Sequence, residues 1–167
     1  ALYFAETGLG DAGMAGIANA MQFAGGIVMG FIFVPVAKAL KKYIFAFVFL
    51  LDACALFAIT LMPDIFVSIG GSFAAGACLG MFFPSSFMNI ASKVDGVYLC
   101  FTSGVFMSCA NLGSFLSPVI ITPIANALGW HTAGERMMFS GIVYATIAVI
   151  LGVSAVMKKE AQSSTTA

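Results

Sequence analysis

The chain has 167 residues, of which 61% are hydrophobic and only 8% are charged, and its net charge is zero. Soluble domains carry roughly 25% charged residues, so this composition supplies too little polar surface for a water-soluble fold. No basic run exceeds two residues, which excludes a nucleic-acid-binding surface. The mean hydropathy of +1.06 predicts an all-α membrane protein, because lipid is the solvent that suits such a chain.

The first stretch, residues 1–11, is too short to cross a bilayer. Its apolar residues are typical of the last turns of a helix. We expect that helix to end near Glu6, where Gly8 can provide a left-handed C-cap. The first residue is Ala1 rather than Met, and no signal-peptide pattern follows it. We therefore expect a fragment whose upstream part is missing.

Five later stretches are long and apolar enough to span a bilayer, which takes about 20 helical residues. They are residues 12–37, 43–62, 65–91, 98–124 and 137–157. The segments between them are polar or contain turn formers. Together they predict one helical bundle domain, residues 1–160. The small polar residues that follow, 161–167, are expected to form a disordered cytoplasmic tail.

Basic residues are distributed unevenly among the connecting segments. Six fall on one side of the predicted membrane, and the opposite side has only Arg136. The six are Lys38, Lys41, Lys42, Lys93, Lys158 and Lys159. Cytoplasmic segments hold an excess of lysine and arginine. We therefore expect the C-terminus in the cytoplasm, in a multi-pass protein of the plasma membrane.

Small residues recur at helical spacing in three of the five stretches, where they would let helix backbones approach closely. The positions are Gly16, Ala20, Ala24, Gly26 and Gly30 in the first stretch, Gly71, Ala75, Gly76 and Gly80 in the third, and Gly104, Ser108, Gly113 and Ser117 in the fourth. The second stretch is mostly bulky. We expect the first, third and fourth helices inside the bundle, and the second and fifth facing lipid.

Polar side chains inside a bilayer are costly, so they usually face the bundle interior or an aqueous path. Asn19 and Gln22 share one side of the first predicted helix, and Ser108 and Asn111 share one side of the fourth. Adjacent phenylalanines in the third can stack against an apolar substrate. The candidates for a substrate pathway are Asn19, Gln22, Phe82, Phe83, Ser108 and Asn111. The alternative is interhelical hydrogen bonding, worth about 0.6 kcal/mol per bond on average.

Asp52 is the one carboxylate deep within a predicted span, about ten residues and so roughly 15 Å from its start. Placing it there ionised costs at least about 2.5–3.5 kcal/mol on insertion scales. Two interpretations stay open. Asp52 is either a proton-coupling carboxylate or a protonated acid that bonds structurally to a neighbouring helix.

The cysteines all fall inside apolar stretches, and no two have C-x-x-C spacing. They are Cys54, Cys78, Cys100 and Cys109. This pattern is typical of buried, reduced thiols. The one histidine, His131, lies in a predicted outer loop. A metal site would need clustered ligands, so we expect no metal, no cofactor and no catalytic residue.

Four segments resemble the C-terminal half of the major facilitator superfamily of transporters. Residues 1–13, ALYFAETGLGDAG, resemble the end of the family's seventh helix, and residues 76–86, GACLGMFFPSS, its glycine-rich tenth helix. Residues 111–120, NLGSFLSPVI, are similar to the eleventh helix. Residues 35–42, PVAKALKK, lie where the family repeats a basic signature. The residues that depart from this signature are Phe33, Ala37 and Leu40.

The resemblance implies a protein of two six-helix halves with substrate bound between them near the middle of the membrane. It implies that the third span lines the cavity, that the first and fourth lie beside it, and that the second, with Asp52, and the fifth lie outside. We expect a secondary active transporter of a small neutral or amphipathic organic solute, driven by a proton or ion gradient. Its partners would be the bilayer and the missing N-terminal half. The alternative is a membrane-embedded enzyme or a non-transporting structural subunit.

Overall fold

A computed structural model describes residues 2–40, 43–130 and 132–165, and these residues form helices without any strand. The helices are α1 (Leu2–Thr7), α2 (Ala12–Leu40), α3 (Ile44–Leu61), α4 (Ile65–Ala91), α5 (Gly96–Ala127) and α6 (Ala133–Thr165). All but α1 are long and apolar enough to cross a membrane. The predicted all-α membrane class and its five spans are confirmed. Ala1, Lys41, Lys42 and His131 lie outside the described residues.

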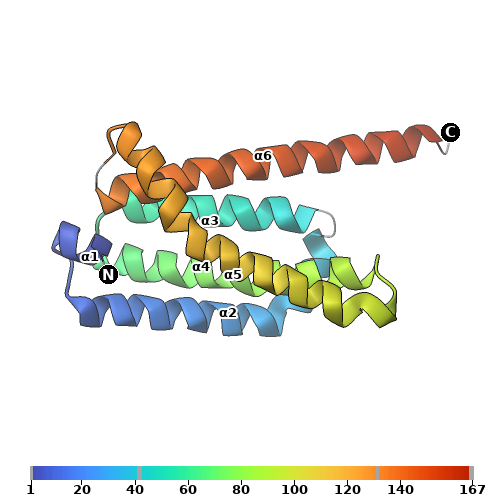
Figure 1. Ribbon diagram of the computed structural model, residues 1–167, viewed down its shortest axis with the longest axis horizontal. Helices are drawn as coiled ribbons and strands as arrows, with labels where there is room; N and C mark the ends of the chain where they lie inside the picture. Colours follow the sequence, from blue (N-terminus) through green and yellow to red (C-terminus); the bar gives the residue numbers. More distant parts are fainter. Residues whose placement is uncertain (1, 41–42, 131, 166–167) are drawn as a thin grey trace.

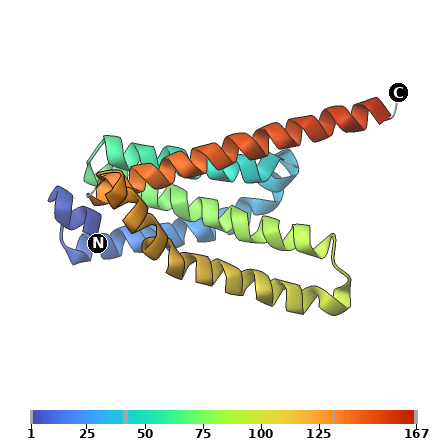
Figure 2. The ribbon, with the colours of Figure 1, turned by 45° about the horizontal axis from the view of Figure 1, so that its top comes forward.

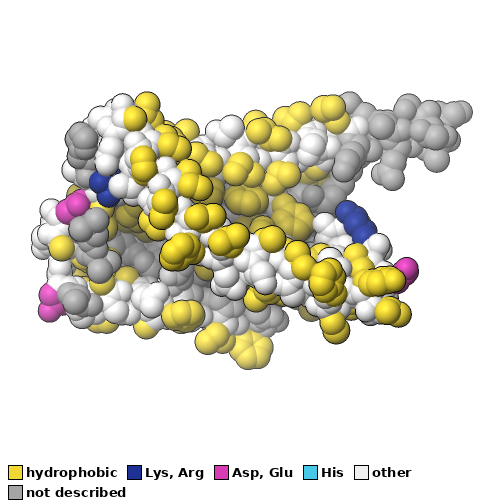
Figure 3. All heavy atoms as spheres, in the orientation of Figure 1, with side chains coloured by type: hydrophobic (Ala, Val, Ile, Leu, Met, Phe, Trp, Pro, Cys, Tyr) yellow, Lys and Arg dark blue, Asp and Glu magenta, His cyan; other side chains and the backbone are white. Residues whose placement is uncertain are grey.

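Four helices lie side by side in the order α2, α4, α3, α6 (Figure 1). The helix α5 crosses one face of this layer at an angle and changes direction in its second half, where Pro118 and Pro123 lie (Figure 2). The short helix α1 sits at one end of the layer and contacts α2 and α6. On the face drawn in Figure 3, the coloured charged side chains are confined to the two ends of the molecule. An apolar middle with charged ends is the surface that a bilayer requires.

The helix ends show why some predicted boundaries were wrong. The first helix ends close to the predicted position, Glu6, because α1 stops at Thr7. Gly8 follows with a φ of 66°, as expected for a left-handed C-cap. The helix α6 begins four residues earlier than predicted, because Thr132 and Glu135 form a reciprocal capping box through their side chains. It also continues to Thr165, where a disordered tail was predicted from Ala161. Residues 158–162 have the sequence KKEAQ, and lysine, glutamate, alanine and glutamine all have high helix propensity.

The closest contact in the bundle joins α2 and α4, and glycines make it possible. A Cβ atom added to Gly25 would collide with the backbone of Phe73, and one added to Gly80 would lie 2.7 Å from the carbonyl oxygen of Gly26. Since residue numbers rise together on both helices, α2 and α4 run parallel. Of the small residues expected to allow close helix approach, Gly26, Gly76 and Gly80 lie at this contact, whereas a Cβ added to Gly16 or Gly30 would meet nothing within 4 Å.

The predicted roles of the other helices were wrong in two respects. The helix α5, expected inside the bundle, buries only Ala125, and a Cβ added to Gly104 or Gly113 would meet nothing within 4 Å. The helix α3, expected to face lipid, lies between α4 and α6 and buries Ile44 and Ile59 among others. Bulky residues fill a helix junction as well as they face lipid, so size alone did not locate α3.

The cysteines differ in their placement. All four are free thiols, as predicted, but only Cys78 is buried within the chain. Cys54, Cys100 and Cys109 are exposed on the outer faces of their helices. An apolar run marks a membrane span and does not distinguish its lipid-facing side from its protein-facing side. The prediction of burial was therefore wrong for these three residues.

Candidate functional site

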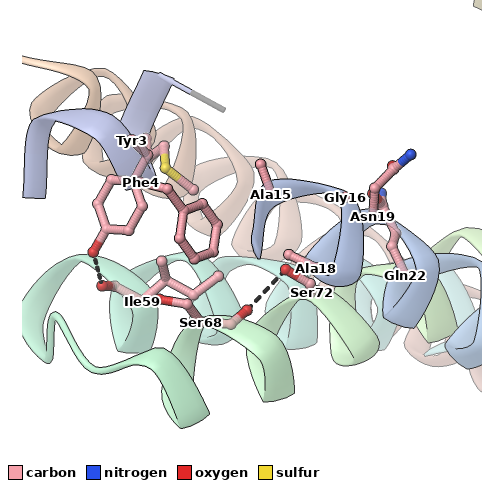
Figure 4. Close-up of a pocket in the computed structure, with 11 residues that line it drawn as sticks. Tyr3, Phe4, Ala15, Gly16, Ala18, Asn19, Gln22, Ile59, Ser68 and Ser72 are labelled. Carbon is pink, nitrogen blue, oxygen red and sulfur yellow. Dashed lines mark hydrogen bonds between the residues drawn. The ribbon is translucent and has the colours of Figure 1, made fainter. Parts of the chain in front are cut away.

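A cavity of about 540 Å³ opens at the α1 end of the bundle (Figure 4). We call it the α1 cavity. Its lining residues are Tyr3, Phe4, Ala15, Gly16, Ala18, Asn19, Gln22, Ile59, Ser68, Ser72 and Met137. They come from every described helix except α5. The volume falls within the range of small-molecule sites, about 300–1,000 Å³.

Uncharged polar side chains from α2 and α4 face this cavity. Asn19 and Gln22 line the cavity from α2, and Ser68 and Ser72 line it from α4. Amide side chains both donate and accept hydrogen bonds, and hydroxyl groups do the same. Among the described residues, the lining contains no acidic or basic side chain. The cavity is therefore equipped to bind an uncharged solute through several hydrogen bonds.

Ser68 contributes a hydroxyl group with no partner. The residue is only 2% exposed, and its Oγ atom makes no hydrogen bond to the described residues, although it lies beside the Tyr3 phenol. Its backbone carbonyl, by contrast, accepts a hydrogen bond of 2.8 Å from the Ser72 hydroxyl (Figure 4). A buried polar atom without a partner is costly to maintain. In the lining of a cavity, it is available to a bound molecule or water.

The aromatic wall of the cavity comes from α1. The Tyr3 hydroxyl donates a hydrogen bond of 2.6 Å to the carbonyl oxygen of Ile59, which ties α1 to the end of α3. The ring of Phe4 is buried in the same apolar cluster as Ala18 and Ile59. Its edge-to-face contact with Tyr3, at 6.0 Å between ring centroids, fixes the two rings together.

A polar contact between α1 and the start of α6 also holds α1 in place. The Glu6 carboxylate accepts a hydrogen bond from the backbone N–H of Ala133, at the first residue of α6. The first N–H groups of a helix lack partners within the helix, and the positive end of the helix dipole lies at the same point. Both features favour a carboxylate there. Glu6 thus anchors the wall that carries Tyr3 and Phe4.

A second cavity, of about 500 Å³, lies at the other end of the α2–α4 pair. We call it the Asn89 cavity. Its lining residues are Phe33, Ala37, Ile44, Phe45, Ser85, Met88, Asn89 and Ser92. The Ser85 hydroxyl donates to the Met81 carbonyl, which leaves Asn89 and Ser92 as its more accessible polar groups. Between the two cavities, α2 and α4 touch at Gly25, Gly76 and Gly80.

Of the predicted pathway residues, only Asn19 and Gln22 line the α1 cavity. Phe82 and Phe83 stack on one another, with ring centroids 5.7 Å apart, and both contact Phe106 of α5. They belong to an aromatic cluster where α3, α4 and α5 meet. Their rings therefore have protein partners and do not face either cavity.

Ser108 and Asn111 are exposed on α5, outside the lining of both cavities. The Asn111 amide donates to the Met107 carbonyl one turn earlier in its own helix. Asp52 is half-buried on α3, the helix that packs against both α4 and α6, and lies near Cys78 of α4 and Tyr144 of α6.

Sequence reasoning missed Tyr3, Phe4, Ser68 and Ser72. The two serines lie four residues apart, so they share one helix face, and this spacing was a usable signal. The pair Tyr3 and Phe4 gave no sequence signal of this kind, because its role depends on where α1 packs. A comparison with protein-family models, with curated proteins and with solved structures finds no match to this chain.

Proposed function

We propose that this chain is the C-terminal half of a secondary active transporter of the major facilitator type, which carries a small, uncharged organic solute. The observation that supports this best is the α1 cavity, a small-molecule-sized space inside a membrane helix bundle. Its described lining residues supply amides, hydroxyls and aromatic rings but no charged side chain. Polar groups within a membrane bundle are costly and usually mark a solute path.

The two cavities on one helix pair support a path between the membrane faces. The α1 cavity and the Asn89 cavity both use α2 and α4, and the glycine contact separates them. In this proposal, a solute reaches one cavity at a time. A movement of the N-terminal half of the protein closes that cavity and exposes the other cavity. Alternating access by rocking of two helical halves provides such a shift.

Asp52 supplies the coupling to a proton gradient in this proposal. It lies away from the solute but at the junction of α3, α4 and α6. The helix α4 lines both cavities. A change in the charge of Asp52 would alter the packing of α4, and with it the access to the solute path. Ion coupling through an intramembrane carboxylate of this kind is a common arrangement.

The proposed orientation puts the lysine-rich ends of the spans in the cytoplasm, so that the Asn89 cavity faces the cytoplasm and the α1 cavity faces outside. The proposed location is the plasma membrane. The other wall of the path comes from an N-terminal half of the same protein. Neither a cofactor nor a catalytic residue takes part.

The test is solute uptake by the complete transporter in proteoliposomes with an imposed pH gradient. A panel of labelled hexose, polyol, nucleoside and amino acid identifies the solute. We expect uptake of an uncharged member, and a loss of at least about tenfold in Gln22→Ala, which removes a group that both donates and accepts. The matched control is Ser72→Ala against Ser154→Ala. Ser72 lines the cavity, and Ser154 is exposed on α6, so only the first should lower uptake. Uptake of none of the four, or equal losses in both serine variants, would contradict the proposal.

A further inference from the structure

A groove at the end of α4 combines one cation with apolar walls. Its volume is about 320 Å³, and it opens between α3, α4 and α5. Its lining residues are Phe45, Ser86, Asn89, Ile90, Lys93, Val94 and Phe106. We call it the Lys93 groove. It lies at the end of the bundle where α2 and α4 both finish, which is one of the two charged ends of the molecule.

Each polar side chain of the groove can donate a hydrogen bond, and one of them carries a positive charge. Lys93 has no ion pair among the described residues, so its charge is uncompensated there. Beside it lie the Asn89 amide and the hydroxyl of Ser86, which is only 8% exposed. Ammonium, amide and hydroxyl groups can together donate to an anion that offers several acceptors. The nearest acidic residue in the sequence, Asp95, does not line the groove.

The remaining walls suit hydrocarbon rather than water. Phe45 comes from α3 and Phe106 from α5, and the Phe106 ring packs on Phe82, Phe83 and Phe87 with centroid distances of 5.5 to 6.4 Å. Ile90 and Val94 complete the apolar surface. The helix α5 contacts α4 sparingly, and its Phe101 and Val105 side chains are exposed.

We propose that the Lys93 groove binds the headgroup of one anionic phospholipid, with an acyl chain lying along Phe45 and Phe106. The phosphodiester supplies the negative charge that Lys93 lacks, and the chain covers the apolar walls. Basic pockets between membrane helices at the level of the headgroups are suited to this kind of ligand. The inference depends only on the chain being a membrane protein and is independent of the proposed transport.

The test uses the complete chain in micelles that contain equal amounts of phosphatidylglycerol and phosphatidylcholine. Native mass spectrometry counts the lipids that stay bound. We expect the wild type to retain one phosphatidylglycerol in preference to phosphatidylcholine. Lys93→Gln should lower this retention about fivefold, as expected for the loss of one lysine near an anionic headgroup. Asn89→Asp, which places a negative charge in the groove at nearly constant size, should also lower it.

The matched control is Lys38→Gln. Lys38 is an exposed lysine in the last turn of α2 and does not line the groove, so its loss should leave retention unchanged. Far-ultraviolet circular dichroism checks that all variants stay helical. Equal retention of the two lipids, or an equal effect of the two lysine variants, would overturn the proposal. So would displacement of the lipid by soluble glycerol phosphate, because the groove would then be a site for a free anion.

Discussion

Gly76 of α4 lies directly against the backbone carbonyl of Gln22 in α2, with no side chain between the two helices. Gln22 also lines the α1 cavity. The backbone atom that sets the helix spacing and the amide that faces the cavity therefore belong to one residue. A change in the spacing of α2 and α4 at Gly76 must also move the polar wall of the cavity.

Gly76→Ala should destabilise the bundle. The added Cβ would overlap the carbonyl group of Gln22, which is backbone and cannot move aside, so α2 and α4 must separate. Overpacking of this kind costs about 1–3 kcal/mol. The measurement is thermal unfolding in detergent. Gly104→Ala is the control, because its Cβ would meet nothing within 4 Å. An equal loss of stability in both variants would show that helix spacing is not the cause.

Tyr3→Phe should loosen α1 without unfolding the spans. The substitution removes the hydrogen bond from the Tyr3 hydroxyl to the Ile59 carbonyl, which is worth about 0.5–1.5 kcal/mol. Amide hydrogen exchange of residues 3–7 should therefore become about two- to tenfold faster, by conversion of that energy. Tyr98→Phe serves as the control, since the Tyr98 side chain is exposed on α5. Unchanged exchange in Tyr3→Phe would mean that Phe4 and Glu6 hold α1 without the Tyr3 hydrogen bond.

Ser68→Ala should leave the stability of the chain unchanged or raise it slightly. The Ser68 hydroxyl is buried and makes no hydrogen bond, so its removal relieves a desolvation cost without breaking a contact. Ser85→Ala is the matched comparison, because Ser85 is equally enclosed in α4 but donates to the Met81 carbonyl. Its loss should cost about 0.5–1.5 kcal/mol in the unfolding free energy. A larger loss for Ser68→Ala than for Ser85→Ala would reveal a partner of the Ser68 hydroxyl.

Under the proposed transport function, Asp52→Asn should separate coupling from solute binding in the complete protein. The amide has nearly the same shape, so the α3–α4–α6 junction stays packed, but it cannot exchange a proton. Uptake driven by a pH gradient should fall at least about tenfold, because a coupling carboxylate has no substitute there. Exchange of labelled for unlabelled solute at equal pH should persist. Loss of both activities together with loss of folded protein would assign Asp52 a structural role.

The sequence predicted where the helices of this fold lie in the chain better than it predicted which helices pack against one another. Long apolar runs sufficed to find all five spans, since hydrocarbon thickness sets their length. The small residues of α2 and α4 predicted that both helices lie inside the bundle, and Gly26, Gly76 and Gly80 meet at their contact, but the sequence did not predict that these two helices pair. The same reasoning failed for Gly104 and Gly113, which face open space. Small residues allow a close contact but do not create the partner helix.

The candidate site was predictable only in part, for a similar reason. Asn19 and Gln22 could be found because polar residues are rare inside a span. Tyr3 and Phe4 could not, since their importance arises from the way α1 folds back onto α3 and α6. Phe82 and Phe83 were selected for their aromatic character, but the surrounding phenylalanines occupy the faces that a solute would use.

The parallel course of α2 and α4 has a consequence for synthesis of the protein. Two parallel helices that lie side by side cannot be joined by a short hairpin loop. Helix α3 must therefore cross the bilayer before α4 can pack against α2. About 50 residues separate Gly25 from Gly76. At roughly 5–20 residues per second, this delay lasts several seconds. During that time Gly25 and Gly26 of α2 lack the α4 backbone that they pack against in the folded bundle.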